Sequence, residues 1–186
     1  MAATIQLDGI YGASPGTAQS VDLLNWRWTT DDAAPTASTT THPLILPTSG
    51  HTWSFWKSYR LNCIVSPVGT VDTVTLWLDA SAYPSNYSLI GQIANVGADG
   101  GYRVASGTVG GTGLELTTTN HTGLVGAPVD AFTWTAASPL VLTGASITNP
   151  STGLFGPYIV LQVVIAAGAV AQPLPAQTLS VAWSET

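Results

Sequence analysis

YIVLQVVIA at Tyr158–Ala166 and TLSVAWSE at Thr178–Glu185 are the two segments that decide the fold. The first is almost entirely apolar, which is typical of a central strand covered on both faces. The second alternates, so that Leu179, Val181 and Trp183 fall on one face and small uncharged residues on the other. A proline-rich linker joins the two segments. Together they predict two well-formed strands near the end of the chain.

Two further segments in the first half of the chain also have strand character. Trp53–Val65 (WSFWKSYRLNCIV) is the longer, and a bulge near Trp56 would bring its aromatic residues onto one face. Val71–Asp79 (VDTVTLWLD) alternates clearly, with Leu76 on one face and Trp77 on the other. Because only five residues separate the two segments, we expect them to form a β-hairpin.

The rest of the chain supports an all-β fold. Helix formers such as Lys, Glu, Arg and Met are scarce, and short apolar runs alternate with turn residues. Pro43–Pro47 (PLILP) suits an edge strand, and Thr29–His42 is a polar stretch that we expect to be an arm or loop. We predict one domain over residues 1–186, a two-sheet β-sandwich of jelly-roll or immunoglobulin-like type with about ten strands.

Composition restricts the possible partners. Only 8% of residues are charged and the net charge is −6, whereas nucleic-acid binding requires clustered Lys and Arg. The most apolar run, Tyr158–Val170, is shorter than the roughly 20 residues of a membrane-spanning helix. The single cysteine, Cys63, excludes an intrachain disulfide. We therefore expect no nucleic-acid or membrane partner.

The sequence contains no recognisable catalytic or metal-binding motif. No Gly-x-Ser-x-Gly occurs, and the acidic residues show no pairing typical of a glycosidase. His42, His51 and His121 lack the spacing of a zinc site, so we interpret them as exposed loop residues. His42 and His51 flank Pro43–Pro47, and a metal site between them is the less favoured alternative. We expect a protein that is not an enzyme and that has no cofactor and no metal.

Tryptophan is the most informative residue type for function, with seven in the chain. Trp26, Trp28, Trp53, Trp56 and Trp77 are candidate interface residues, because subunit contacts are enriched in aromatic side chains. Exposed coplanar indoles would instead stack on sugar rings. Packing within the sandwich is a third interpretation, and the sequence leaves all three open.

The N-terminal segment MAATIQLD has neither the basic region nor the apolar run of a secretory signal. Yet a surface rich in Thr, Ser, Gly and Ala is typical of proteins that face the environment. A virus particle combines both properties, since its proteins are made in the host cytoplasm and then exposed. We therefore expect the protein to be located in a virion.

A resemblance supports this expectation. Trp53–Val65, Val71–Asp79, Pro128–Thr135, Phe155–Gln162 and Gln177–Glu185 together resemble small β-sandwich capsid or capsid-decoration proteins of bacterial and archaeal viruses. The resemblance implies a structural role in the particle and no catalytic residue.

The expected function is that of a capsid decoration (cement) protein or small capsid subunit. Its partners would be copies of itself and other virion proteins, and its contacts would stiffen the shell. Two alternatives remain: a carbohydrate- or receptor-binding module of a phage tail or surface appendage, which would contact glycans, and a subunit of an extracellular filament.

Overall fold

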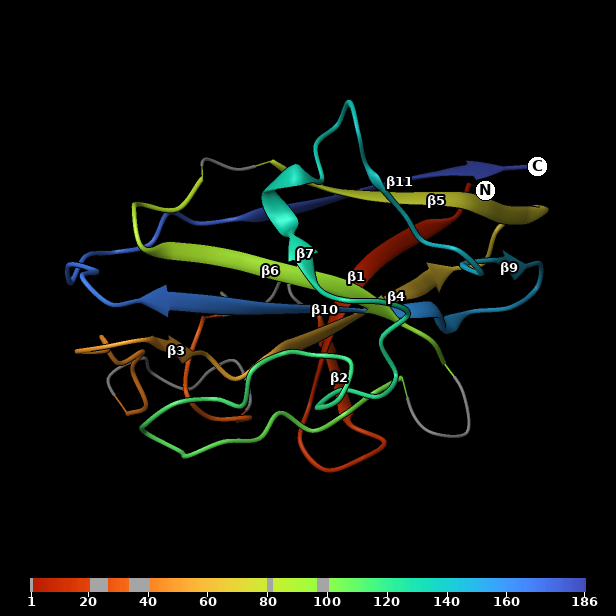
Figure 1. Ribbon diagram of the computed structural model, residues 1–186. Helices are drawn as coiled ribbons and strands as arrows, with labels where there is room; N and C mark the ends of the chain where they lie inside the picture. Colours follow the sequence, from red (N-terminus) through yellow and green to blue (C-terminus); the bar gives the residue numbers. More distant parts are fainter. Residues whose placement is uncertain (1, 21–26, 34–40, 80–81, 97–100) are drawn as a thin grey trace.

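The computed structural model describes residues 2–20, 27–33, 41–79, 82–96 and 101–186. Two antiparallel sheets account for nearly all of its regular structure (Figure 1), which confirms the predicted all-β sandwich. The described residues form eleven strands, close to the ten expected. In chain order the elements are β1 (Thr4–Tyr11), β2 (Thr17–Ser20), β3 (His51–Trp53), β4 (Lys57–Val65), β5 (Thr70–Asp79), β6 (Tyr87–Ala94), β7 (Val129–Asp130), the 3₁₀ turn η1 (Ala131–Thr133), β8 (Leu140–Val141), β9 (Ile147–Thr148), β10 (Gly153–Ala166) and β11 (Thr178–Glu185).

We call the larger sheet, of seven strands, sheet A. Its order is β2-β1-β4-β10-β6-β7, and β3 also pairs with β10. Sheet B has four strands, in the order β11-β5-β8, with β9 also paired to β5. The apolar run at residues 158–166 lies in β10, between β4 and β6, as its composition predicts. The alternating run at residues 178–185 is β11, at one edge of sheet B.

The main core lies between the two sheets and is built from alternating strand residues. Leu61 of β4, Leu76 of β5 and Ile159 of β10 have no exposed surface, and Leu161 has 1%. Burial of each such side chain contributes roughly 1.5–3 kcal/mol to folding. We call this cluster the inner core.

The predicted hairpin between residues 53–65 and 71–79 is wrong. β4 belongs to sheet A and β5 to sheet B, so the link after Val65 crosses from one sheet to the other. Both strands bury one face in the inner core. An alternating apolar pattern is therefore expected both for two strands that face each other across the core and for two neighbouring strands of one sheet.

Two other strand predictions also need correction. The segment 53–65 is interrupted at residues 54–56 and becomes β3 and β4, which both pair with β10. This interruption takes the place of the bulge expected near Trp56. Pro43–Pro47 forms no ladder with the described strands, and Ile45 instead accepts a hydrogen bond at its carbonyl oxygen from Thr52 Oγ1 at 2.6 Å.

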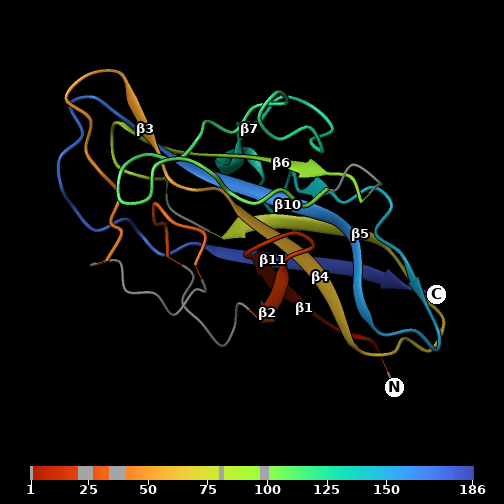
Figure 2. The same ribbon diagram turned by 90° about the horizontal axis from the view of Figure 1, so that it is seen from below.

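A third layer covers the outer face of sheet A. The described part of the 95–128 segment, between β6 and β7, crosses this face on the side away from β5 and β11 (Figures 1 and 2). Its residues Tyr102, Leu116 and Leu124 pack with Trp56 and Val160 in a second cluster, which we call the outer core. The layer makes only isolated bridges among its described residues. The central part of sheet A, around Val160 and Gln162 of β10, is therefore buried on both faces.

Gln162 fastens this layer to the sheet. It is fully buried on the outer face of β10. Its Oε1 accepts from the Leu116 amide at 2.7 Å, and its Nε2 donates to the carbonyl oxygens of Ser54 and Leu114, each at 2.8 Å. A buried amide with every hydrogen bond satisfied fixes the position of its partners more strictly than apolar contact does.

We expect Gln162→Met to lower the free energy of unfolding by about 3 kcal/mol, because two buried backbone groups and one partly buried backbone group lose their partner. Urea unfolding measures the loss, and the Leu116 amide should exchange with deuterium faster. Gln92→Met is the matched control, since Gln92 Nε2 donates to the carbonyl of Ala127 at the surface. Equal losses in the two variants would contradict the role given to Gln162.

Candidate functional site

Four ionisable side chains, Lys57, Asp31, Asp32 and His42, form a polar cluster at the start of β4. Lys57 is the first residue of this strand and is only 4% exposed. Its Nζ donates to Thr29 Oγ1 at 3.3 Å and to the carbonyl oxygen of Asp31 at 3.2 Å. Burial lowers the pKa of Lys57, whereas the nearby Asp32 and Asp31 act to raise it. A lysine in this position needs acceptors inside the protein, and the loop at residues 29–32 supplies them.

Asp31 connects this lysine to a histidine. Asp31 Oδ1 accepts from Thr29 Oγ1 at 2.8 Å, and Oδ2 lies 2.5 Å from His42 Nδ1. Burial acts to raise the pKa of Asp31, but the hydrogen bonds from Thr29 and His42 and the charge of Lys57 outweigh it, so that the pKa is lowered. The carboxylate is therefore held in its charged form.

Asp32 behaves differently from its neighbour in sequence. Its Oδ2 accepts from the Gly12 amide at 2.9 Å, and the Tyr102 hydroxyl donates to the Gly12 carbonyl at 2.6 Å. Burial raises the pKa of Asp32 to about 6, although the Gly12 amide and the charge of Lys57 act in the opposite direction. The two adjacent carboxyl groups thus titrate in different pH ranges because their surroundings differ.

The same cluster closes the loop that follows Trp28. The Thr30 amide donates to the carbonyl oxygen of His42 at 3.1 Å, which brings the ends of this loop together. The Gly110 amide, in a glycine-rich turn, donates to the Thr30 carbonyl at 3.3 Å. The predicted arm at Thr29–His42 is therefore fixed to its own chain at both described ends, and residues 34–40 lie outside the described part.

This geometry favours a structural role for the cluster. A carboxylate beside an imidazole can support general base catalysis, but only if a substrate reaches the other ring nitrogen. In the described structure, Lys57 joins the loop at residues 29–32 to β4, whereas the carboxylates of Asp31 and Asp32 join that loop to His42 and Gly12. His42 and His51 are not brought together, because His42 pairs with Asp31 while the His51 ring lies 6.1 Å from that of Trp53. Over the described residues, no group of three potential metal ligands occurs.

We expect Asp32→Asn to change how stability depends on pH. The folded protein holds a proton on Asp32 in a range where the unfolded carboxyl, with a pKa of 3.8, has released it. The contribution of Asp32 to stability is therefore fully present below pH 3.8 and is lost as pH rises through about 6. Relative to the variant, the fall should be roughly 2 kcal/mol after allowance for solvent screening. Urea unfolding at a series of pH values measures it, and parallel curves would contradict it.

His121 is a buried histidine that the sequence analysis placed on the surface. It has no exposed area and packs edge-on against Trp56, with ring centroids 5.5 Å apart. Neither ring nitrogen has a hydrogen-bond partner in the described structure. Burial, together with the charge of Arg103, lowers its pKa to about 4. Its polar neighbours in sequence, Asn120 and Thr122, gave no sign that the imidazole turns inward.

We expect His121→Phe to remove a loss of stability at acid pH. The unfolded histidine takes up a proton near pH 6.5, whereas the folded one stays neutral down to about 4. The contribution of His121 to stability should therefore fall by roughly 2 kcal/mol as pH is lowered from 6.5 to about 4, and the variant should lack this contribution. NMR titration of the imidazole provides a direct check. A folded-state pKa near 6.5 would refute the prediction.

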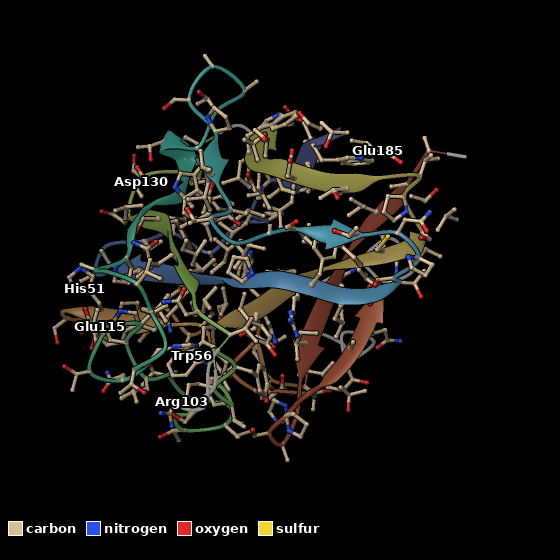
Figure 3. The ribbon with its side chains drawn as sticks, turned by 90° about the vertical axis from the view of Figure 1, so that its right-hand side faces the viewer. His51, Trp56, Arg103, Glu115, Asp130 and Glu185 are labelled. Carbon is tan, nitrogen blue, oxygen red and sulfur yellow. The ribbon has the colours of Figure 1, made fainter. Side chains whose placement is uncertain are left out.

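The tryptophans predicted at interfaces differ in how deeply their side chains are buried. Trp26 lies outside the described residues. Trp28 is half-buried against the inner core, and its Nε1 donates to Tyr83 Oη at 2.9 Å. Trp56 is 2% exposed, and its Nε1 donates to the Arg103 carbonyl at 2.9 Å (Figure 3). Contrary to its prediction as an interface residue, Trp56 has no surface left for a partner, because its indole fills the outer core.

Trp53 and Trp77 remain half-exposed, but on opposite sides of the sandwich. Trp53 lies opposite Val164 of β10, on the outer face of sheet A. Trp77 lies opposite Ser180 of β11, on the outer face of sheet B. A sugar-binding platform needs two rings on one face. These two tryptophans do not provide it.

Sheet B has the most open surface among the described strands. Around Trp77 the outer face holds the small residues Thr75, Ser180 and Ala182, which follow from the register of β5 and β11. Asp79 accepts from Trp77 Nε1 at 2.9 Å and from the Ser180 hydroxyl, so its carboxylate is engaged within the sheet. β11 pairs with β5 alone among the described strands.

Glu185, at the end of β11, holds the two sheets together at one end of the sandwich. Its carboxylate accepts from the Ala3 amide at 2.9 Å and from the Val68 amide at 2.6 Å. These hydrogen bonds lower its pKa. A shallow hollow of about 400 Å³ lies beside it, lined by Ala2, Val68, Gly69, Glu185 and Thr186. Because the carboxylate is already engaged, the hollow offers a ligand little besides backbone.

Comparison with models of known protein families, with curated proteins and with solved structures finds no match to this chain. Within the described residues, no helix has the length and apolar character needed to cross a membrane. Inference about function therefore rests on the polar cluster, the two cores and the open side of sheet B.

Proposed function

We propose that the protein is a structural component of a virus particle, either a capsid decoration protein or a small capsid subunit. It acts through contacts with copies of itself and with other virion proteins. The observation that carries this proposal is the open side of sheet B, where an eight-residue edge strand adjoins an outer face of small residues around Trp77.

This surface suits repeated association. Ser180 and Ala182 carry no charge, so burying them against another protein costs little desolvation. The edge of β11 away from β5 pairs with none of the described strands, so it offers backbone donors and acceptors to a further strand. Trp77 supplies one large, half-exposed ring of the kind that anchors protein interfaces.

The buried chemistry supports the same proposal. Lys57 is engaged in joining the loop at residues 29–32 to β4, and Asp31 and Asp32 hold hydrogen bonds from Thr29 and the Gly12 amide. Their interactions stabilise the subunit and leave contact with partners to uncharged surfaces. The carbohydrate-binding alternative gains no support from the described tryptophans, since Trp53 and Trp77 face opposite directions.

Immunogold electron microscopy tests the proposed location. An antibody raised against the purified chain is applied to virus particles and cell-surface material from the organism that carries the gene. We expect gold on the capsids of intact particles. Label confined to tails would favour receptor binding, and label on cell-surface fibres would favour a filament. Either result would overturn the proposed shell role.

A further inference from the structure

We propose that the edge of β11 pairs in antiparallel orientation with β11 of a second copy of this chain. The pairing joins two four-stranded sheets into one continuous sheet of eight strands, related by a two-fold axis. This pairing names a second copy of the chain as one partner of the open side of sheet B. It rests on the proposed function only for the place where the dimer acts, the virus particle.

β11 lacks the lysine and proline that protect many edge strands, although its register against β5 shifts between Ala182 and Ser184. Natural edges are commonly short, or carry lysine or proline that discourages a further strand. β11 has eight residues, TLSVAWSE, with neither lysine nor proline. The other edge strands of the described sheets are shorter, with four residues in β2 and two in β7. β11 is therefore the longest template for strand addition among them.

The inward side of β11 is incompletely covered. Leu179, Val181 and Trp183 pack against the inner core but remain half-buried. Their partners on β5 are buried, since Leu78, opposite Leu179, is 7% exposed and Leu76, opposite Val181, is fully buried. A further strand beside β11 would reduce this remaining exposure, which is the apolar gain expected from pairing.

Charge favours a second copy in antiparallel orientation. Glu185 is the only charged residue of the strand, and it lies at one end. In a parallel pair the two Glu185 carboxylates would lie side by side, whereas in an antiparallel pair they lie at opposite ends, near Thr178. The central residues Ser180 and Ala182 are small, so the same strand fits against itself without steric or electrostatic conflict.

A charge-swap experiment on the full chain tests the pairing. Ala182 is exposed and lies beside the middle of β11, so the two copies of it lie close together across the two-fold axis. We expect the wild type to be a dimer by sedimentation equilibrium. Ala182→Lys alone and Ala182→Glu alone should each weaken the dimer by about tenfold or more, because like charges then face each other. An equimolar mixture of the two variants should restore it.

Ala18→Lys is the matched control, because Ala18 is exposed on β2, the edge strand of sheet A. It should leave the dimer intact, and circular dichroism should show that every variant is folded. A monomeric wild type, or a dimer that neither charge weakens, would refute the pairing. If both variants lose the dimer and the mixture does not restore it, β11 contacts a surface other than β11 of the second copy, which would also refute the pairing. A monomer that still labels capsids would overturn this pairing and leave the shell role standing.

Discussion

The side-chain amide of Gln162 is the contact on which the layered arrangement depends. It joins the central strand β10 to a layer that has no strand ladder of its own among the described residues. Apolar burial draws that layer onto Tyr158 and Val160, but burial has no direction. Three hydrogen bonds from one buried group supply the direction, and they fix where the polypeptide crosses the sheet.

This outer layer divides the molecule into a closed side and an open side. The central part of sheet A is covered on both faces, and Lys57 ties the loop at residues 29–32 to its strand β4. Among the described residues, sheet B buries one face in the inner core, and its edge strand β11 pairs with β5 alone. The surface best suited to association thus consists mainly of small uncharged residues, has the Asp79 carboxylate engaged within the sheet, and lies over the inner core.

Sequence patterns predicted those elements whose burial imposes a period. β10 and β11 follow directly from the apolar run at residues 158–166 and the alternation at residues 178–185. The sheet to which a strand belongs leaves no such mark, which is why β4 and β5 were expected to pair. The burial of Trp56 and His121 was also beyond prediction, because it depends on a loop layer that packs without periodicity.

The same reasoning applies to the polar cluster. Asp31 and Asp32 are adjacent in sequence and chemically identical, yet one faces His42 and the other the Gly12 amide. Only the folded loop distinguishes them, since each pKa follows from local hydrogen bonds and burial.

The burial of Lys57 gives the protein an unusual chemical property. It is the only lysine in the sequence, and 4% of its surface is exposed. Amine-directed labels and cross-linkers therefore find no lysine on the native surface. Acylation at this position would require the loop at residues 29–32 to open, so the rate of such labelling measures how often the structure beside β4 unfolds locally.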